Sequence, residues 1–552
     1  MSAIAPEETP AAANEGAERT IAVSIETLAW IAVGAIFLGI RLWPIWQMPV
    51  GGAELVHLSG AWNASIGVED DRYVPTLFQA LTALSFAFTT SEVPARLLAF
   101  LATATIPLAL FMLRPLLGTG GALIALGILA FDAVGVVAGV GAGAMGFDLA
   151  IAAWLFVLLT RADVPPWAWA AAAFAVTTGG PIALPLVVAA AATTLLRAER
   201  PPWRSLTWPA AGIVAGIALT TLRPGLGPDG LTIAPTALFV DGFEQRWSTA
   251  DGLGLFILAS WPVVVGGLLA AAWRVYDAWR LNELDRDEML LLLWTAFALG
   301  WFVTALPSHD PTPLAALALP SALLLGPGLV RGFAAVRDAD WTYTQYLIPF
   351  AAIALSIAVF YVGDWAKLDR VGNTSDKLVV TGLMLATLAA LAVALLDRWS
   401  APTVLTLLVP LAAVPLVVAT ATIAFRAGDA PLPSPLSPVQ ARELRDIALQ
   451  SVGDDGGSIV IHPDFDDALT WPFRDSGTVV VASRIPEDAG FVLWPGEGAP
   501  PDGFAPLEGD WALLHEVDSP ATGFLKFMRW YTDRYSLAIT SEPVAVYVRE
   551  NE

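Results

Sequence analysis

Glu54 and His57 are the first residues of the chain whose types and spacing suggest chemistry. They stand three positions apart in "GGAELVH", directly after the first long apolar segment, and the chain contains only four histidines. Residues three apart lie on one face of a helix. A carboxylate held there could accept the proton of a sugar hydroxyl as a general base. The alternative, which the residue type alone favours, is a carboxylate that stabilises the start of a helix.

Two aspartates accompany long apolar segments. Asp148, in "AMGFDLAIAAWLF", lies at the start of the fourth predicted span, where the dipole of a helix N-terminus would stabilise its charge. Asp132 lies inside "LGILAFDAVGVV", and an ionisable residue within an apolar span is a functional candidate by default. The other interpretation of Asp132 is a hydrogen-bonded side chain in the interior of a helical bundle. Each aspartate is therefore a candidate with a structural alternative.

A third candidate site is the turn "PSHDPTP", in which His309 precedes Asp310. An adjacent imidazole and carboxylate could bind a phosphate, a metal ion or a sugar hydroxyl, although Asp-Pro is also typical of an ordinary turn. The chain has no cysteine, which excludes disulfides, thiolate nucleophiles and cysteine-ligated metal. Carboxylates could still bind a divalent metal ion, although the sequence does not indicate which residues would be its ligands. No cofactor is indicated with certainty.

The glycine-rich stretch "GAGAMG" matches the dinucleotide-binding pattern G-x-G-x-x-G. That pattern requires a preceding strand in a soluble βαβ unit. Here it joins two apolar segments, so we reject cofactor binding at this position. Gly135, Gly139 and Gly143 recur every four residues, which predicts close packing between helices.

The composition is typical of an integral membrane protein. Hydrophobic residues make up 56% of the chain and charged residues 14%, against about 25% charged residues in soluble domains. The net charge of −22 excludes nucleic acid as a partner, because binding it requires a basic surface. A membrane helix needs about 20 apolar residues. We predict about thirteen spans, near residues 24–43, 93–114, 119–140, 147–160, 166–178, 181–196, 205–222, 253–274, 289–306, 312–330, 345–363, 378–396 and 403–425.

The distribution of arginine predicts the orientation in the membrane. With a cytoplasmic N-terminus, the short inner loops hold more basic residues than the longer outer loops, which is the positive-inside bias. The loop 44–92, with Glu54 and His57, then lies on the outer face, as does the C-terminal region. The amphipathic stretch "YVPTLFQALTALSFAF" in this loop predicts contact with membrane lipid at the surface.

The composition divides the chain into four parts. Residues 1–23 read as a disordered tail, 24–425 as the membrane domain, 426–437 as a Pro-rich linker and 438–552 as a soluble domain. In the last part a helix begins at Pro438, and five apolar runs read as short strands: "SIVIHP", "TVVVASR", "FVLWP", "WALLHEV" and "PVAVYVRE". The predicted fold class is an α-helical polytopic membrane protein with a small C-terminal α/β soluble domain.

The order of these features resembles the multi-spanning membrane glycosyltransferases of the GT-C type, the group of protein mannosyltransferase and aminoarabinose transferase relatives. "RLWPIWQMPVGGAELVHLSGAW" is similar to the segment that carries an acidic pair in that family, and places Glu54 there. "SEVPARLLAF" places Arg96 on the family's usual arginine, and "GFDLAIAAWLF" places Asp148 on its second acidic site. In the tail, "TWPFRDSGTVVVAS" and "FMRWYTDRYSLAI" look like an archaeal and bacterial branch associated with flipping of lipid-linked glycans.

The resemblance implies transfer of a sugar from a polyprenyl-phosphate carrier to a glycan, lipid or protein acceptor on the outer face. It implies that Glu54 is the general base and that Asp148 binds the acceptor or a metal. It also implies that Arg96 or another outer-loop arginine pairs with the carrier's phosphate through its planar guanidinium. The candidate substrate-binding residues are His57, Arg96, His309 and Asp310.

The chain departs from the family pattern at three places. Ala53 stands where an acid is usual, and the arginine that usually precedes the second acid is missing from "GVGAGAMGFD". The Arg-Tyr pair that often precedes a late span is replaced by "SHDPTPLAAL". The alternative function is therefore a non-catalytic membrane protein that assists the flipping or assembly of lipid-linked glycans.

Overall fold

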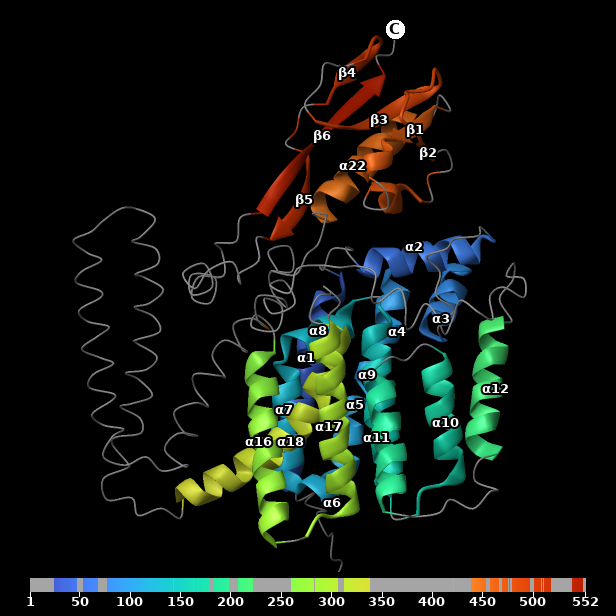
Figure 1. Ribbon diagram of the computed structural model, residues 1–552. Helices are drawn as coiled ribbons and strands as arrows, with labels where there is room; N and C mark the ends of the chain where they lie inside the picture. Colours follow the sequence, from blue (N-terminus) through green and yellow to red (C-terminus); the bar gives the residue numbers. More distant parts are fainter. Residues whose placement is uncertain are drawn as a thin grey trace, which may run out of the picture.

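In a computed structural model, the protein is a bundle of roughly parallel helices with a small sheet domain above one end of the bundle (Figure 1). The predicted tail and linker lie outside the described residues, as do the predicted spans between 345 and 425, apart from Thr420. The structure describes residues 24–46, 53–67, 77–141, 143–161, 163–178, 182–197, 207–221, 260–281, 283–305, 312–337, 420, 438–452 and 457–549, the last range without 466–468, 475, 477–478, 497–500, 508, 510 and 518–538.

Helix α1 (Ile25–Leu42) opens the bundle. Ser24 caps it, because its Oγ accepts a hydrogen bond from the N–H of Thr27 at 3.1 Å. From Ile25 to Leu42 the chain is mostly apolar and contains no helix-breaking proline. The short 3-10 helix η1 (Trp43–Trp46), which contains Pro44, follows α1. Helix α1 and η1 thus come directly before the segment that carries Glu54 in the sequence.

The predicted span near 93–114 is interrupted. It consists of α4 (Val93–Thr103) and α5 (Ile106–Met112), and Pro107 lies at the start of α5. Proline has no N–H to donate back along a helix and is tolerated in the first turn, so a new helix begins there rather than α4 continuing.

The predicted span near 119–140 is interrupted in the same way. It consists of α7 (Thr119–Ala130) and α8 (Ala133–Val140), with Asp132 between them. The N–H of Gly135 donates to Oδ2 of Asp132 at 2.8 Å, so this carboxylate caps the start of α8.

The remaining described helices complete the bundle. Among the residues that the structure describes, four segments are long and apolar enough to cross a membrane: Ile25–Trp46, Val93–Met112, Arg286–Thr304 and Thr312–Ala334. Shorter apolar helices run beside them (Figure 1), as the membrane-protein fold class predicts. The bundle helices whose bounds have not yet been given are α6 (Arg114–Leu117), α9 (Ala144–Leu159), α10 (Pro166–Thr177), α11 (Ala183–Leu196), α12 (Thr207–Thr221), α16 (Trp261–Leu281), α17 (Arg286–Ala305) and α18 (Thr312–Arg337).

Glycines allow close approach between helices of the bundle, as two examples show. A Cβ built on Gly326 of α18 would clash with the carbonyl oxygen of Gly121, so α7 and α18 pack backbone to backbone. A Cβ on Gly139 would instead lie 3.0 Å from Cδ of Arg41, and one on Gly135 would lie 3.5 Å from Nη2 of Arg41. The glycine repeat predicted to bring helices together thus makes room for a buried arginine.

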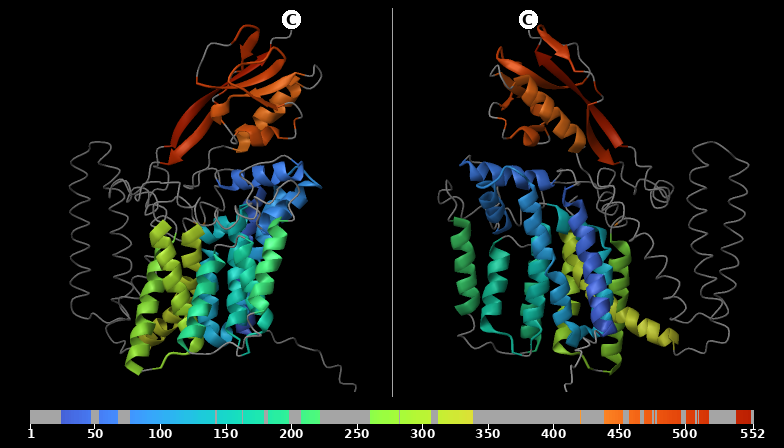
Figure 2. Two further views of the ribbon diagram at one scale, coloured as in Figure 1. Left: turned by 45° about the vertical axis from the view of Figure 1, so that its right-hand side comes forward. Right: turned by 180° about the vertical axis from the view of Figure 1, so that it is seen from behind.

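Two helices from the loop 44–92 lie at the end of the bundle nearest the sheet domain. Helix α2 (Ala53–Ser65) runs across this end, below the sheet domain, and α3 (Leu77–Phe86) lies beneath α2 (Figure 1 and Figure 2). Helix α3 buries Phe78 and Thr82, whereas Leu84 is 58% exposed and Phe88, just beyond its end, is 84% exposed. Exposed apolar side chains at this end of the bundle are expected of a helix that contacts membrane lipid.

The sheet domain begins with α22 (Pro438–Val452), close to the helix predicted from Pro438. Its strands are β1 (Ser458–Ile461), β2 (Val479–Val481), β3 (Ala489–Pro495), β4 (Phe504–Pro506), β5 (Ala512–Val517) and β6 (Ile539–Arg549). Five of them coincide with the predicted apolar runs, and β4 was not predicted. The order is β2-β1-β3-β6-β4, with β5 also paired to β6. The pairs among β1, β2 and β3 are parallel and those with β6 are antiparallel.

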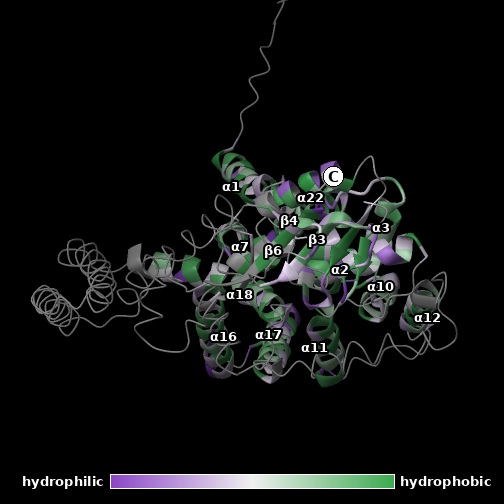
Figure 3. Cartoon of the chain, turned by 90° about the horizontal axis from the view of Figure 1, so that it is seen from above, coloured by the Kyte–Doolittle hydropathy of each residue, from purple (hydrophilic) through white to green (hydrophobic). Residues whose placement is uncertain are grey.

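The parallel strands need a helix on their face, and α22 supplies it. Leu444 and Ala448 of α22 share a buried cluster with Ile459, Phe491 and other residues of the sheet. Seen from above in Figure 3, the sheet domain lies over the part of the bundle that carries α2 and away from α16. The small α/β domain is thus placed above the loop helices that carry Glu54.

Candidate active site

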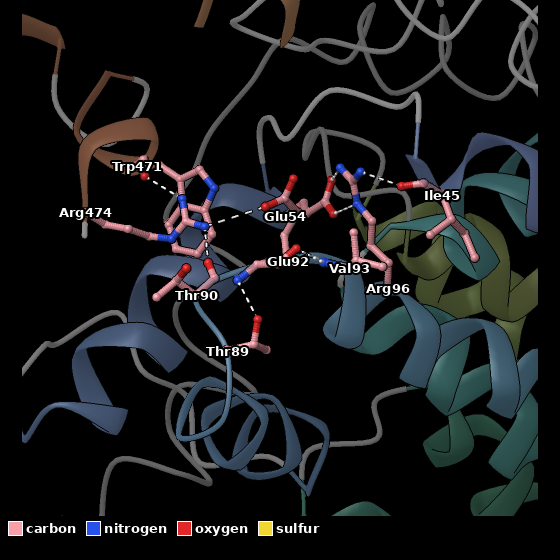
Figure 4. A network of polar contacts seen from close by, with 10 residues as sticks. Ile45, Glu54, Thr89, Thr90, Glu92, Val93, Arg96, Trp471 and Arg474 are labelled. Carbon is pink, nitrogen blue, oxygen red and sulfur yellow. Dashed lines mark hydrogen bonds and ion pairs between the residues drawn. The ribbon is translucent and has the colours of Figure 1, made fainter. Parts of the chain in front are cut away.

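Glu54 and Arg96 form a buried ion pair between the loop helix α2 and the membrane helix α4 (Figure 4). Nε of Arg96 donates to Oε1 of Glu54 at 2.8 Å and Nη2 donates to Oε2 at 3.1 Å. The side chains are 9% and 1% exposed. A two-point pair of this kind fixes the plane of the carboxylate as well as its position.

Arg96 also connects this pair to the end of α1. Its Nη1 donates to the carbonyl oxygen of Ile45 in η1 at 2.9 Å. One guanidinium of α4 therefore joins η1, α2 and α4. The phosphate-binding role predicted for Arg96 stays a prediction, because in this structure two of its nitrogens are directed to Glu54.

His57 follows Glu54 by three residues on α2 and is half-buried. Its carbonyl oxygen accepts a hydrogen bond from Nε2 of Gln79 at 3.3 Å, which joins α2 to α3. A Cβ built on Gly143 would lie 4.0 Å from Cδ2 of the His57 ring. The imidazole therefore lies against the start of α9, the helix that carries Asp148.

Asp148 is buried, with 5% exposure, in the second turn of α9. The helix begins at Ala144 and has no acidic residue in its first turn, so Asp148 lies beyond the turn where the dipole acts most strongly. The rings of Phe147 and Phe78 are 5.9 Å apart and bring α3 against the same end of α9. The fold thus gathers Glu54, His57 and Asp148 at the end of the bundle nearest the sheet domain.

Asp132 belongs to a second buried polar cluster, which includes an arginine that the sequence analysis did not single out. Ser260 Oγ donates to Oδ1 of Asp132 at 2.5 Å. Nη2 of Arg41 donates to the carbonyl oxygen of Leu129 at 2.8 Å, and its guanidinium stacks 3.6 Å above the ring of Phe37. Arg41 is 2% exposed and Asp132 is 1% exposed. The signal available in the sequence was a charged residue inside the first apolar span.

The remaining candidates can be placed only in part. His309 and Asp310 lie outside the described residues. Among the residues that the structure describes, no group of three or more His, Asp or Glu side chains is arranged to hold a metal ion. The sites with defined geometry are therefore the Glu54–Arg96 pair with its neighbours and the Asp132 cluster.

Comparison with known proteins identifies the fold. No family model and no curated protein sequence matches the chain. The solved structure of ArnT from Cupriavidus metallidurans bound to undecaprenyl phosphate is similar over 83% of this chain and 86% of that one, with 17% identity and a TM-score of 0.50. The apo structure of the same protein is similar over 81% and 84%, with 17% identity and a TM-score of 0.49. ArnT is a GT-C aminoarabinose transferase. The chain therefore has the GT-C fold of the multi-spanning membrane glycosyltransferases, joined to a small α/β domain.

Proposed function

We propose that the protein is a membrane glycosyltransferase that moves a sugar from a polyprenyl-phosphate carrier to an acceptor on the outer face of the cell membrane. Two observations support this proposal: the GT-C fold, and a structural neighbour that was solved with undecaprenyl phosphate, a lipid of the carrier class. A donor anchored in lipid reaches the protein within the bilayer. Such an enzyme needs no separate domain for a soluble nucleotide sugar.

The observation that carries the proposal is the Glu54–Arg96 pair. Glu54 is a buried carboxylate on a loop helix at the end of the membrane bundle, and Arg96 holds it in a defined plane. A group that transfers a proton in a transition state has to be positioned before the reaction, and this pairing positions it.

In the proposed reaction, the acceptor hydroxyl gives its proton to the carboxylate of Glu54. The acceptor oxygen forms a bond to the anomeric carbon of the sugar, and the bond from that carbon to the phosphate oxygen breaks. The polyprenyl phosphate leaves with the electron pair. Once Glu54 has taken the proton, the positive charge of Arg96 is no longer balanced by it and complements the phosphate that is released.

Asp148 and His57 complete the proposed site. Asp148 binds the acceptor or a metal ion, and His57, which lies against the start of α9, binds substrate beside it. His309 and Asp310 remain candidates for substrate binding. The acceptor is a glycan, a lipid or a protein.

The proposed orientation places the N-terminus in the cytoplasm and the sheet domain outside. The short helix α6, which begins at Arg114, lies at the end of the bundle opposite α2 (Figure 1). A basic residue at that end supports a cytoplasmic assignment for it. The end that carries Glu54 then faces the outer leaflet.

The direct test is Glu54→Gln, which keeps the size of the side chain and removes its ability to accept a proton. Membranes whose polyprenyl-phosphate sugars carry a radioactive label are incubated, and the label is followed from the carrier fraction into the acceptor fraction. We expect the transfer rate to fall by about 10²–10⁴-fold, the usual contribution of general acid–base catalysis.

Glu26→Gln is the matched control. Glu26, in the first turn of α1, also pairs with an arginine, Arg114 at the start of α6, but that pair is exposed. This variant should transfer label at the wild-type rate. If Glu54→Gln also does so while the wild-type chain is required for surface glycosylation, the catalytic proposal fails and the non-catalytic role in flipping or assembly is favoured.

A further inference from the structure

One short segment of the sheet domain reaches down to the loop helices of the membrane domain. Trp471 lies in the 3-10 helix η6 (Trp471–Phe473) and is 5% exposed. Its ring packs 5.9 Å from the ring of Phe86 of α3, and that ring lies 5.6 Å from the ring of Trp62 of α2. Trp471 is part of one buried cluster with Leu55, Leu58, Ala61, Phe86 and Ala95.

The same turn is anchored in its own domain. Phe473, two residues after Trp471, is fully buried and lies 6.3 Å from the ring of Phe491 of β3. Phe473 belongs to the cluster between α22 and the sheet, whereas Trp471 belongs to the cluster of the loop helices. The turn therefore joins two hydrophobic cores, one in each domain.

Arg474 adds polar contacts beside this apolar contact (Figure 4). Its Nη1 donates to the carbonyl oxygen of Trp471 at 2.7 Å, and its Nη2 donates to the carbonyl oxygen of Thr90. Nη2 also lies 3.6 Å from Oε2 of Glu92. The guanidinium stacks 3.8 Å above the Trp471 ring and lies 6.0 Å from the ring of Trp62. The side chain is 8% exposed, so its charge depends on these partners.

The contacts of Trp471 and Arg474 reach both helices that carry the Glu54–Arg96 pair. Glu92 is the N-cap residue of α4, and its carbonyl oxygen accepts the N–H of Arg96 at 3.2 Å. Trp62 lies on α2, the helix that carries Glu54. Trp471 and Arg474 therefore contact the helix on each side of the ion pair.

We propose that Trp471 and Arg474 are positioning residues, which hold α2 and the start of α4 together from above and so keep Glu54 aligned with Arg96. The sheet domain thereby acts as a latch on the site. Its effect on catalysis rests on the proposed function, whereas its effect on the loop helices does not.

The absence of cysteine from the chain permits a clean test of the latch. Ala61, which is fully buried in the cluster with Trp471, is replaced by cysteine as a reporter. Modification of this reporter thiol by a membrane-impermeant maleimide is timed in the full-length protein in liposomes. We expect Arg474→Ala and Trp471→Ala each to raise the labelling rate by about tenfold or more, because a buried charge or an aromatic contact is lost. Arg474→Lys, which keeps the charge and loses the fork, should give a smaller increase.

Two controls separate a local effect from general unfolding. Arg549→Ala removes an arginine of the same domain that donates to the carbonyl oxygen of Glu487 at 2.8 Å, away from the loop helices. It should leave the labelling of the Ala61→Cys reporter unchanged. A second reporter, Ala189→Cys in the core of the bundle, should stay protected when Arg474 is replaced. Equal labelling of the Ala61→Cys reporter with and without the Arg474→Ala and Trp471→Ala substitutions would overturn the latch.

Transfer of labelled sugar by the same variants tests the positioning role. A latch predicts that Arg474→Ala lowers kcat in proportion to the exposure of the Ala61→Cys reporter, and that Arg474→Lys restores part of both. If Glu54→Gln abolishes transfer but Arg474→Ala leaves it unchanged, the positioning role is wrong and the proposed function stands. If Glu54→Gln has no effect on transfer while Arg474→Ala still exposes the reporter, the proposed function fails and the latch on the loop helices remains.

Discussion

Glu54 and Arg96 meet in a two-point ion pair that joins a loop helix to a membrane helix across 42 positions of sequence. Both side chains are buried, so neither charge is solvated when the other is removed. The pair thus links the stability of this end of the bundle to the placement of the proposed base.

We expect Arg96→Ala to destabilise the protein by about 3–5 kcal/mol, because it leaves the Glu54 carboxylate buried without this partner. The substitution also removes the hydrogen bond to the carbonyl oxygen of Ile45. Thermal unfolding of the purified full-length chain measures the change. Arg114→Ala is the control, since its pair with Glu26 is largely solvated and should contribute about 0–1 kcal/mol. If Arg96→Ala and Arg114→Ala lower the free energy of unfolding by similar amounts, the buried pair does not hold α2 to α4.

Asp132 is expected to stabilise the start of α8 inside the membrane domain. Asp132→Ala removes the cap on the N–H of Gly135, which contributes about 1 kcal/mol, and leaves Ser260 without its acceptor. Ser260→Ala removes one hydrogen bond and should cost about 0.5–1.5 kcal/mol, less than Asp132→Ala. Thermal unfolding of both variants checks the order. A functional role for Asp132 instead requires that Asp132→Asn, which keeps the size of the side chain, abolishes sugar transfer without lowering the unfolding temperature.

Gly139 is expected to be required for the placement of Arg41. A Cβ at Gly139 would lie 3.0 Å from Cδ of Arg41 and 3.1 Å from Oγ1 of Thr103, and both neighbours are buried. Gly139→Ala should therefore destabilise the protein by about 1–3 kcal/mol, measured by thermal unfolding.

Gly127→Ala is the matched control for this prediction. Gly127 lies in α7, and nothing lies within 4 Å of a Cβ built on it. The variant should be neutral or stabilise by up to about 1 kcal/mol, because alanine has the higher helix propensity. The prediction is wrong if the two variants have the same unfolding temperature.

The helical membrane domain and the α/β domain could be predicted from the sequence because both depend on local pattern. Runs of apolar residues long enough for a bilayer predict helices whatever packs against them. Short β-branched runs such as "SIVIHP" predict strands because their residues suit a pleated sheet. The breaks before Pro107 and at Asp132 were missed, because the mean hydropathy of the segment stays high where a proline or a capping carboxylate starts a new helix.

The chemistry of single residues depended on contacts that local pattern does not contain. The sequence offered Glu54 as a candidate base and Arg96 as a candidate phosphate ligand, and only the packing of α2 against α4 made them partners. Arg41 stands inside the first apolar run and Arg474 in the tail segment "TWPFRDSGTVVVAS", but neither position shows which groups the side chain meets. In the fold, Arg41 is buried beside Asp132 and Arg474 joins the two domains. Two charges pair strongly only when the fold brings them close together in a region from which water is excluded. The sequence states which side chains are available, and the tertiary structure decides which of them meet.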